Sequence, residues 1–551
     1  MIRITELRLP LGHAEGDLRA AVLKRLGLAS AEFTVFKRSY DARKKAAIQL
    51  IYTVDCTGFD DAAVLARFAG DPHIKPTPDT GYHFVSHAPA DFYAEQRPRP
   101  VVIGFGPCGI FAALILAQMG LRPIVLERGK QARERTKDTW GLWRQGELHA
   151  ESNVQFGEGG AGTFSDGKLW SQISDPRHLT RKVLTEFVKA GAPEEILFVS
   201  KPHIGTFRLV SVVTKMRAEI EALGGEIRFE QRVSDVLIEG NHVRGITLQS
   251  GEQIRTDHVV LALGHSARDT FTMLHQRGVY MEAKPFSIGY RIEHPQGLID
   301  RARFGPNAGN EILGAADYKL VHHASNGRSV YSFCMCPGGT VVAATSEPNR
   351  VVTNGMSQYS RNERNANAGI VVGISPQDYR QDGKTDGIVS PLDGMAFQRL
   401  WESRAFELGE GGYQAPGSLV GDFIKRQRSS AFGGVEPSYK PGVTLTDLQQ
   451  KGNGSLPDYA LDAIREALPA FERQIKGFSM PDAVLTGVET RTSSPLRITR
   501  GRDYQSVNIH GLFPAGEGAG YAGGIMSAGV DGIEVAEAVG ASMLGAAMRM
   551  P

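Results

Sequence analysis

A glycine-rich turn between an apolar strand and an apolar helix is the first feature of this sequence that could bind a ligand. Residues 104–109 read GFGPCG, a GxGxxG pattern, after the apolar run 101–103 and before a helix that extends to Met119. The first glycine allows a tight turn, the second lets the backbone approach a diphosphate, and the third lets helix and strand pack closely. The helix N-terminus attracts the diphosphate through its free N–H groups and its dipole. The segment therefore predicts a dinucleotide site.

Glu127 supports a dinucleotide at this turn. It ends the next predicted strand, 122–127, and follows Gly104 by 23 residues. A carboxylate at about this spacing can accept both hydroxyls of an adenosine ribose. It would repel a 2′-phosphate, because both groups are anionic. A glycine turn beside a solvated glutamate is the alternative, and the combination of strand, turn, helix and carboxylate disfavours it.

A second glycine cluster follows in the same half of the chain. Residues 155–169 read QFGEGGAGTFSDGKL and include five glycines. Without Cβ atoms, the backbone can lie flat against a planar ring. Thr163 and Ser165 can also donate hydrogen bonds to a diphosphate or to the ring. We therefore expect Gly159, Gly160 and Thr163 to bind the ligand; a purely structural glycine loop is the alternative.

A third cluster lies near the end of the sequence. Residues 512–520 read LFPAGEGAG and lead through Gly523, Gly524 and Ile525 into a helix of small residues that extends to Ala538. The N-terminus of such a helix would stabilise the negative charge that a flavin acquires at its N1–C2=O edge on two-electron reduction. A simple NAD dehydrogenase does not require the chain to return so far downstream. We therefore expect the dinucleotide to be FAD.

Together these segments resemble the second subgroup of the glutathione-reductase-type FAD superfamily. More narrowly, they resemble the bacterial family of FAD-dependent dehydrogenases, also called NAD(P)/FAD-dependent oxidoreductases. The resemblance extends over nearly the whole chain and includes segments 156–169, 259–268, 331–339, 487–495 and 513–532. It implies FAD binding and an oxidoreductase reaction, and it does not assign a substrate.

The resemblance also implies roles for residues that their spacing does not identify. It indicates that 512–520 is a second flavin fingerprint, in which a strand delivers an acid to the ribityl–phosphate part of FAD. Val233 would meet the adenine, and Gly264 would lie beside the adenosine. The complete set of expected cofactor-binding residues is Gly104, Gly106, Pro107, Gly109, Glu127, Arg128, Gly159, Gly160, Thr163, Val233, Gly264, Gly516, Glu517, Gly523, Gly524 and Ile525.

Three cationic residues are considered as candidates for catalysis. Lys168 follows the second glycine cluster and could stabilise an anionic substrate or the reduced flavin; a solvated lysine is the alternative. Arg491 and Arg497 flank a polar segment before the third cluster, where an arginine fork could bind a carboxylate. A structural ion pair is the alternative for both arginines. We select Lys168 and Arg491 as catalytic residues.

The four cysteines indicate a functional role less clearly than the glycine clusters do. Cys334 and Cys336 lie on a predicted strand, which would place both thiols on one face. A redox-active pair is conceivable, but burial as small apolar side chains is the favoured interpretation. Cys108 lies within the dinucleotide turn and is interpreted as a packing residue. No spacing of cysteine or histidine suggests a metal site.

The chain divides into four predicted parts. Residues 1–95 alternate as β-α-β-β-α-β, the order of a small ferredoxin-like α/β domain whose last strand is expected at 82–86. Residues 96–279 form the first part of a Rossmann-type FAD-binding domain of glutathione-reductase type. Residues 280–480 form an inserted α+β substrate or cap domain, with an antiparallel sheet at 280–350, and residues 481–551 complete the FAD-binding domain. The fold class is α/β.

Composition limits the range of functions. The chain has 551 residues with 62 Lys plus Arg and 60 Asp plus Glu, a net charge of +2, so no global field favours nucleic acid or an acidic membrane. Four cysteines exclude a disulfide scaffold and favour a reducing compartment. Residues 1–17 contain no apolar core of signal-peptide length, and the longest apolar run, 110–121, is interrupted by Gln118 and too short to span a bilayer, so we expect a cytoplasmic protein.

The leading interpretation is an FAD-dependent oxidoreductase that transfers a hydride between a small organic substrate and flavin N5. NADH or NADPH could serve as a transient electron donor without a Rossmann domain of its own. An FAD-dependent monooxygenase is the first alternative, although the Asp-Gly pair typical of aromatic hydroxylases is replaced by Leu263-Gly264. The second is a flavoprotein that binds RNA or a protein through basic residues at 37–45, which a solvated hairpin explains more simply. The sequence does not indicate the oligomeric state.

Overall fold

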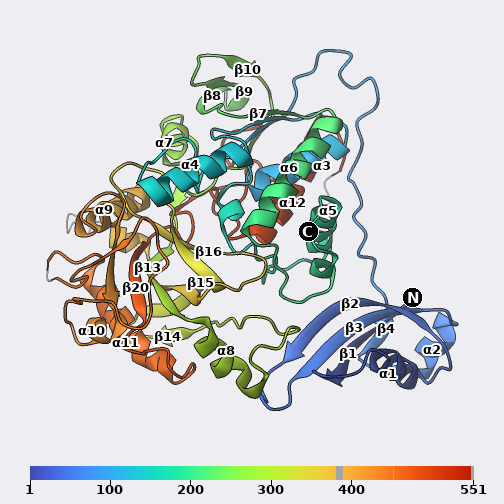
Figure 1. Cartoon of the computed structure of the whole chain (residues 1–551). Helices are drawn as coiled ribbons and strands as arrows, with labels where there is room; N and C mark the ends of the chain where they lie inside the picture. The colour runs from blue at the N-terminus through green and yellow to red at the C-terminus, as the bar shows by residue number, and fades with distance from the viewer. Residues whose placement is uncertain (380–388, 451, 548–551) are drawn as a thin grey trace.

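The structure, a computed structural model, describes residues 1–379, 389–450 and 452–547. Its N-terminal unit comprises β1 (Ile2–Pro10), α1 (Asp17–Leu26), β2 (Glu32–Asp41), β3 (Gln49–Thr57), α2 (Asp61–Arg67) and β4 (Ile74–Pro76). The four strands form a sheet in the order β2-β3-β1-β4, in which all neighbours are antiparallel (Figure 1). Alternate residues of β1 and β3 are buried, because one face of this sheet packs against the helices.

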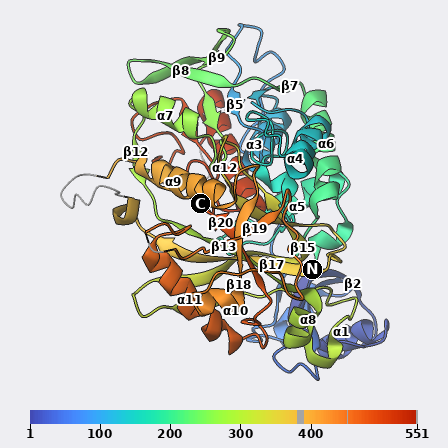
Figure 2. The same cartoon turned by 60° about the vertical axis from the view of Figure 1, so that its left-hand side comes forward.

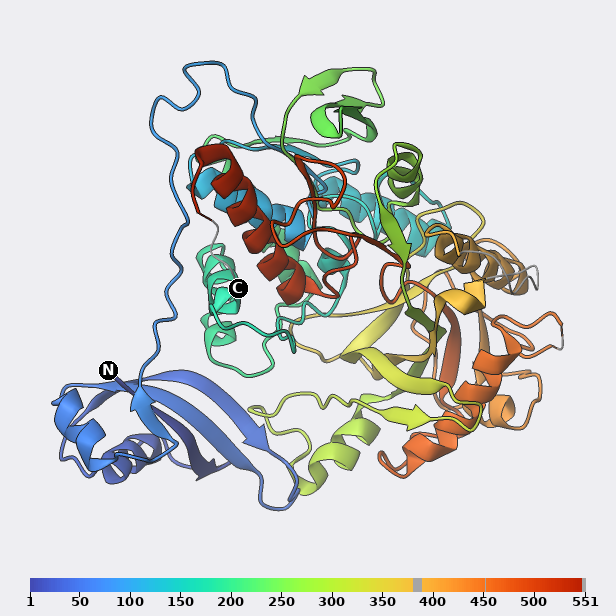
Figure 3. The same cartoon turned by 180° about the vertical axis from the view of Figure 1, so that it is seen from behind.

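The prediction of a last strand at 82–86 is wrong. The fourth strand lies earlier, at Ile74–Pro76, and residues 77–100 contain no strand. Tyr82, Phe84 and Val85 instead pack against the hydrophobic core of the next unit. Figures 1 and 3 show this extended segment leaving the N-terminal sheet and running along the side of the molecule. The apolar side chains are explained by this packing against a neighbouring unit.

A five-stranded parallel sheet forms the centre of the second unit. Its strands are β5 (Val101–Ile103), β6 (Ile124–Leu126), β7 (Glu226–Arg228), β11 (Val259–Leu261) and β22 (Leu512–Pro514). They lie in the order β22-β11-β5-β6-β7, and every neighbouring pair is parallel. The loops that follow the carboxyl ends of these strands therefore meet at one edge of the sheet, where open α/β sheets bind ligands.

Helix α3 (Pro107–Gln118) is buried on every side, and each residue from Cys108 to Ala117 is buried. The parallel sheet covers one side, and α6 (Thr206–Ala222) and α12 (Ile525–Leu544) cover others. Figure 3 shows α12 packed along α3, although more than 400 residues separate them in sequence. This environment explains why α3 is apolar all round rather than amphipathic.

The remaining elements of the second unit flank the parallel sheet. Three antiparallel strands in the order β10-β9-β8 lie between β7 and β11 in sequence, beside the helix α7 (Figure 1). The bounds are α4 (Ala132–Gln145), η1 (Ala161–Phe164), α5 (Leu179–Lys189), η2 (Glu194–Leu197), β8 (Val233–Glu239), β9 (His242–Leu248), β10 (Gln253–Arg255) and α7 (Arg268–Gln276).

An eight-stranded sheet organises the third unit, which we call the cap. Its strands are β13 (Phe286–Pro295), β14 (Val321–His323), β15 (Ser329–Ala343), β16 (Thr353–Ser357), β17 (Asn365–Ile374), β18 (Ala415–Leu419), β19 (Val443–Leu445) and β20 (Val484–Glu489). The order is β14-β15-β17-β13-β20-β18-β19, with β16 paired to β15. The antiparallel sheet predicted at 280–350 is confirmed by these pairings. β20 joins the same sheet from beyond residue 480 by pairing with β13 and β18.

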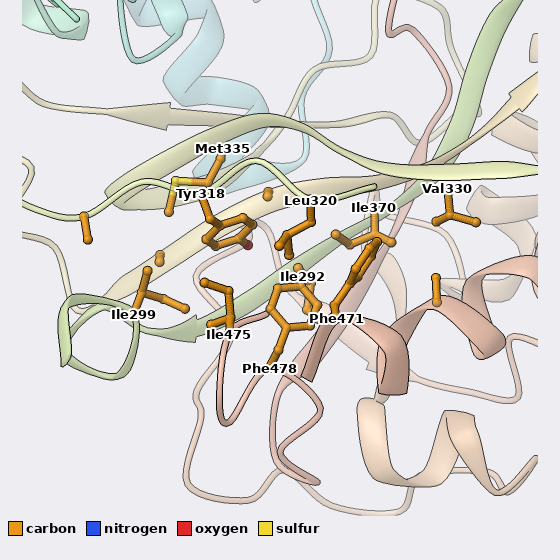
Figure 4. Close-up of a cluster of buried hydrophobic side chains, with 14 of the residues drawn as sticks. Ile292, Ile299, Tyr318, Leu320, Val330, Met335, Ile370, Phe471, Ile475 and Phe478 are labelled. Atoms are coloured by element: carbon orange, nitrogen blue, oxygen red, sulfur yellow. The ribbon is translucent and has the colours of Figure 1, made fainter. Parts of the chain in front are cut away.

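Helices cover the cap sheet, as Figure 2 shows for α9, α10 and α11. The bounds are α8 (Gln296–Phe304), η3 (Gly305–Asn307), η4 (Pro376–Tyr379), α9 (Asp393–Leu408), α10 (Val420–Ile424) and α11 (Asp458–Glu472), and a separate pair consists of β12 (Met281–Ala283) and β21 (Leu496–Ile498). Figure 4 shows the core beneath the sheet, where Met335 of β15 lies with Tyr318, Ile292 and Phe478. In the described part of the chain, no helix has the length and apolar character needed to cross a bilayer.

Candidate functional site

A cavity of about 780 Å³ lies at the carboxyl edge of the parallel sheet. Its walls include the turn after β5, the loops after β6 and β11, the second glycine cluster and the start of α12. The cap closes it with residues 331–335 of β15 and with Asn354 of β16. This volume lies within the range typical of cofactor and small-molecule sites. The three glycine clusters singled out in the sequence therefore contribute to one cavity.

The glycines of the GxGxxG turn make the close approaches that the pattern predicts. Gly104 has φ +98°, and a Cβ there would lie 2.5 Å from the carbonyl oxygen of Ala262. A Cβ on Gly109 would lie 1.9 Å from the carbonyl oxygen of Gly104. Gly106 precedes α3 as its N-cap and lines the cavity. The first and third glycines are therefore required for packing, whereas the second leaves the backbone accessible to a ligand.

Glu127 is buried at the end of β6 and lines the cavity. Its Oε2 accepts the N–H of Phe105 at 2.9 Å, and its Oε1 accepts the N–H groups of Gly129 and Gly157 at 2.8 and 2.9 Å. The carboxylate thereby connects the dinucleotide turn to the second glycine cluster. A carboxylate has about four acceptor positions and three N–H groups use three of them, so one position remains for a ligand hydroxyl.

Arg135 of α4 was not among the predicted site residues, yet it organises the second glycine cluster. Its guanidinium is fully buried and donates to the backbone carbonyls of Asn153, Val154, Gly157, Glu158 and Gly160. Burial lowers the pKa of Arg135 to about 10, so it remains charged at neutral pH. In the sequence it lies within a helix rich in charged residues, where an arginine is expected at the surface. No sequence signal distinguishes it.

The second glycine cluster contains residues that line the cavity and residues that only shape the loop. Gly160 lines the cavity, as do the positions from Ser165 to Lys168. Thr163 does not, because its side chain is buried and donates to the carbonyl of Glu158 at 3.3 Å. A Cβ on Gly159 would lie 2.0 Å from Thr163 Oγ1. The structure thus turns the Thr163 hydroxyl inward, away from the ligand contact predicted for it.

The third glycine cluster reaches the cavity through the start of α12. Nothing lies within 4 Å of a Cβ built on Gly523 or Gly524, so the backbone there is open. Gly516 lies outside the lining: its N–H donates to Asp531 at 2.6 Å, and a Cβ would press against Cys108 at 2.8 Å. The predicted cofactor residues that line the cavity are Gly104, Gly106, Pro107, Glu127, Arg128, Gly160, Val233, Gly264, Glu517, Gly523, Gly524 and Ile525.

Lys168 lies where the cavity meets the cap. Its Nζ donates to the carbonyl of Met335 and lies 3.9 Å from Asp166. Asp166 also pairs with Arg361, at 2.9 Å from Nε. Burial opposes ionisation of Asp166, but Arg361 and Lys168 hold its pKa below the usual value. The structure therefore places Lys168 at the site, with a carboxylate to orient it.

Arg491 lines the cavity, but its guanidinium is held by partners within the protein. Its Nε and Nη2 donate to the two oxygens of Glu402 at 3.0 and 2.9 Å, and Nη1 donates to Ser266 and Ser346 at 2.9 and 2.7 Å. Arg268 donates to the same carboxylate at 2.7 Å. Four of the five N–H donors of Arg491 are thus used within the protein, which disfavours a bidentate contact with a substrate carboxylate. Arg491 instead belongs to a buried ion-pair network, the alternative that the sequence left open.

The two cysteines of β15 do not follow the regular strand geometry that was expected. Cys334 has φ +42° and lines the cavity, whereas Cys336 is fully buried. Pairing with β17 shifts between Phe333 and Cys336, which marks a β-bulge. All four cysteines are free thiols. Within the described residues, no group of three or more metal-ligating side chains occurs.

The cavity has the polar and backbone groups that an elongated flavin dinucleotide requires. The backbone of Gly264 is open, since nothing lies within 4 Å of a Cβ built there. The neighbouring ring of His265 is buried, and within the described residues neither ring nitrogen has a hydrogen-bond partner, although Nδ1 lies 3.1 Å from Glu517 Oε1. A buried polar group without a partner is costly, so a polar ligand is favoured here. Together with open N–H groups at α12, these residues fit FAD.

Comparison with known families supports this assignment of the cofactor. Residues 158–278 match the family of flavin containing amine oxidoreductases. Residues 285–492 match the C-terminal domain-like family of FAD-dependent proteins, and residues 1–57 match a domain of unknown function. The first two matches cover the second glycine cluster and the cap, the two regions that meet at Lys168.

The solved structures that resemble this chain have low sequence identity to it and low TM-scores. L-amino acid deaminase from Proteus myxofaciens is 11% identical, with 86% of this chain and 94% of that chain covered and a TM-score of 0.35. L-proline dehydrogenase from P. horikoshii is 14% identical, with 83% and 95% covered and a TM-score of 0.32. These scores are too low to establish a common fold.

One curated protein is similar over nearly the whole chain. A Clostridium beijerinckii protein described as uncharacterized is 45% identical over 542 residues, which are 97% of this chain and 98% of that protein. Such identity over both full lengths establishes common membership of a family. The matches to flavin and FAD-dependent families agree with the cavity that the glycine clusters build. The chain therefore belongs to the family of the Clostridium beijerinckii protein, and it is an FAD-dependent oxidoreductase.

Proposed function

We propose that FAD lies along the carboxyl edge of the parallel sheet in the manner of glutathione-reductase-type flavoproteins. The adenosine would contact Glu127 and the loops that contain Val233 and Gly264, and the diphosphate would lie at residues 104–109. The flavin ring would lie between residues 160–168 and the start of α12. The single observation that carries this placement is the convergence of all three glycine clusters on one cavity.

The same proposal extends to the division of the chain. The N-terminal unit would be a ferredoxin-like domain, which its strand order β2-β3-β1-β4 supports. Residues 96–279 and the part of 481–551 that follows β20 would form the FAD-binding domain, because β22 and α12 pack with β11 and α3. β20 lies within the predicted range 481–551 but belongs to the cap sheet. The cap would be the substrate domain inserted between them, since its strands β15 and β16 close the cavity opposite the parallel sheet.

The reaction would be a two-electron exchange between a small organic substrate and the bound cofactor. FAD supplies the redox chemistry by accepting or donating a hydride at N5. The N-terminal N–H groups of α12 would stabilise negative charge at the ring, and Lys168 would hold an anionic group of the substrate beside it. Asp166 and the carbonyl of Met335 orient the Lys168 ammonium for this role.

A second cavity supports a route by which the substrate reaches this position. It has a volume of about 370 Å³ and shares Lys168, Trp170, Lys201 and Asp317 with the cofactor cavity. The N-terminal unit contributes residues 38–40 to its wall. Backbone hydrogen bonds from Arg38 to Phe198 and from Ser200 to Arg38 hold that unit against the second unit. The N-terminal unit would therefore form one side of the substrate entrance.

Anaerobic stopped-flow spectroscopy of the FAD-loaded protein tests this function. We expect the visible flavin absorbance to bleach on mixing with NADH or NADPH, or else with an organic donor found by screening small anionic substrates. Free FAD under the same conditions provides the control for uncatalysed reduction. A protein that binds no FAD on refolding with the cofactor, or one whose FAD is no more reactive than free FAD toward all these donors, would contradict the proposal.

A further inference from the structure

Two cysteines of β15 lie at the wall of the cofactor cavity and have no part in the function proposed above. Cys334 lines the cavity between Phe333 and Met335, and Cys336 is buried directly behind it. Met335, the residue between them, lies in the core of the cap (Figure 4). The core side chain thus anchors the segment. Cys334 lies at the cavity that would hold the flavin ring, and Cys336 lies deeper in the protein.

The β-bulge brings the two cysteines out of the regular strand arrangement. Phe333 pairs with Gly369 and Cys336 pairs with Asn367, so two residues of β15 oppose one residue of β17. Cys334 has φ +42°, a region that residues other than glycine rarely occupy. In a regular strand, side chains two residues apart are parallel and well separated. The bulge bends the strand here, and the Cys336 thiol reaches the carbonyl oxygen of Cys334 at 3.4 Å.

A buried guanidinium holds the backbone of this pair. Arg291 of β13 donates to the carbonyl of Cys334 at 2.8 Å, and both oxygens of Glu489 accept from Arg291 at 2.8 Å. Space for the thiol and the guanidinium comes from Gly355 of β16. A Cβ at this position would lie 2.9 Å from the sulfur of Cys336 and 2.6 Å from Arg291 Nη1. Three neighbouring strands therefore contribute to one pocket around the two thiols.

The surrounding groups shift the pKa values of the two thiols in opposite directions. The hydrogen bond from Cys336 lowers the pKa of Cys334, burial opposes this, and the positive charges of Arg291 and Lys168 lower the pKa further. Asp166 acts in the opposite direction, as does Glu489, which partly neutralises Arg291. The pKa of Cys336 is raised by its hydrogen bond to Cys334, by burial and by the charge on Cys334. A thiolate beside a protonated thiol is the arrangement found in dithiol redox pairs.

We propose that Cys334 and Cys336 form a redox-active dithiol that exchanges two electrons with the flavin in the cavity. This inference depends on the proposed position of the ring between residues 160–168 and α12. On oxidation, one S–S bond forms, the remaining thiol proton is released, and two electrons pass to oxidised flavin, which takes up its proton from solvent. In the reverse direction, reduced flavin supplies the two electrons that break the S–S bond, and the sulfur of Cys336 is reprotonated.

A reductive titration measures this electron exchange directly. FAD-loaded protein that has been oxidised by air should take up four electrons per FAD from dithionite, two for the flavin and two for the disulfide. Cys334→Ser and Cys336→Ser should each take up only two. Cys56→Ala provides a matched control, because this buried cysteine lies in the N-terminal sheet, and it should still take up four. A wild-type protein that takes up two electrons would overturn the proposal.

Peptide mass analysis tests the same pair without any variant and without the flavin colour. Cleavage after Arg328 and Arg350 gives one tryptic peptide, residues 329–350, that contains both cysteines. From air-oxidised protein this peptide should be lighter by two hydrogen atoms and resistant to alkylation; after dithionite, both cysteines should be alkylated. Equal alkylation in both states would overturn the proposal. If the flavin reacts with a donor while this peptide stays reduced, the dithiol inference fails and the proposed function stands.

Discussion

Arg135 illustrates how a single side chain can determine the shape of a ligand-binding loop. Its planar fork carries five N–H donors, and it meets five backbone carbonyls of residues 153–160. These carbonyls converge because the loop contains glycines with positive φ, such as Gly157 and Gly160. The guanidinium therefore holds the loop in its conformation, and the loop carbonyls in turn satisfy the buried guanidinium. The cavity wall thus depends on Arg135, which does not line the cavity.

Replacing Arg135 with lysine should release FAD and destabilise the protein. A lysine ammonium is compact and cannot reach all five carbonyls, and each buried acceptor left unpaired costs about 1–3 kcal/mol. We expect Arg135→Lys to lose most of its FAD during gel filtration and to lower the free energy of unfolding by about 2–4 kcal/mol. Arg133→Lys, at an exposed position of the same helix, should retain both properties. Stoichiometric FAD in Arg135→Lys would contradict this role.

Lys168 is the residue whose charge is expected to act on the reaction itself. Removing it in Lys168→Ala should slow flavin reduction by an anionic donor about tenfold, equivalent to about 1.4 kcal/mol of transition-state stabilisation. FAD should remain bound, because the glycine clusters are unchanged. The exposed Lys189 of α5 provides the matched control as Lys189→Ala. Stopped-flow rates at several donor concentrations separate binding from the reduction step, and equal rates in both variants would argue against a role for Lys168.

At the scale of elements, the connection from β5 to α3 carries the greatest steric constraint. The three-residue strand and the buried helix approach so closely that Gly109 has no room for a methyl group. The carbonyl oxygen that a Cβ would strike belongs to Gly104, within the same turn. The clash involves backbone rather than a flexible side chain, so the turn itself would have to move.

Gly109→Ala should therefore abolish FAD binding. The methyl group would displace the turn from its ligand-binding conformation, with a cost of at least about 3 kcal/mol in stability. Gly141→Ala offers a matched control within α4, where the nearest atom to a Cβ is a carbonyl oxygen at 3.8 Å. That substitution should be neutral or stabilise the helix by up to about 1 kcal/mol. Absorbance at the visible flavin bands and urea unfolding would distinguish the two outcomes.

For the molecule as a whole, a buried ion-pair network connects the FAD-binding part to the cap. Glu402 of α9 accepts from Arg268, at the start of α7, and from Arg491, just after β20. Glu347 adds a partner for Arg268 and for Arg399. Burial opposes ionisation of both glutamates, but the arginines hold their pKa values below the usual range, with Glu347 at about 2. The network therefore fixes the cap only while these carboxylates are charged.

Stability should accordingly fall in acid. In the unfolded chain both glutamates titrate near pH 4.5, so their contribution is fully present above that pH and is lost as the pH falls toward 2. Glu402→Gln should lower the free energy of unfolding by about 3–5 kcal/mol at pH 7, because Arg491 is left buried without a charged partner and Arg268 keeps only Glu347. The stability of this variant should also decline less steeply in acid. Glu407→Gln, an exposed position on the same helix, should change stability by less than about 0.5 kcal/mol. Urea unfolding between pH 3 and 7 measures both effects, and a pH-independent difference would contradict the expectation.

Much of the cofactor site could be predicted because its determinants are local. A GxGxxG turn between an apolar strand and helix requires the same close approaches wherever it occurs, and residues 104–109 make them. Glu127 lies in the cavity for the same reason, since the end of a neighbouring parallel strand reaches the same edge. Thr163 and Gly159 do not line the cavity. The Thr163 hydroxyl is turned toward the carbonyl of Glu158, a direction that depends on packing within the irregular loop.

The sequence alone determined that this chain binds a dinucleotide, that the cofactor is FAD and that an antiparallel sheet lies between two parts of a parallel one. The dinucleotide site and the sheet follow from glycine spacing and strand periodicity, which act over a few residues, and FAD follows from the resemblance of 512–520 to a flavin fingerprint. Only the tertiary structure decided that Arg491 is held by Glu402, that Arg135 supports the glycine loop and that Cys334 lines the cavity while Cys336 is buried. Such contacts join residues that lie far apart in sequence. They depend on which side chains are buried together in the folded protein, and a local sequence pattern does not predict this.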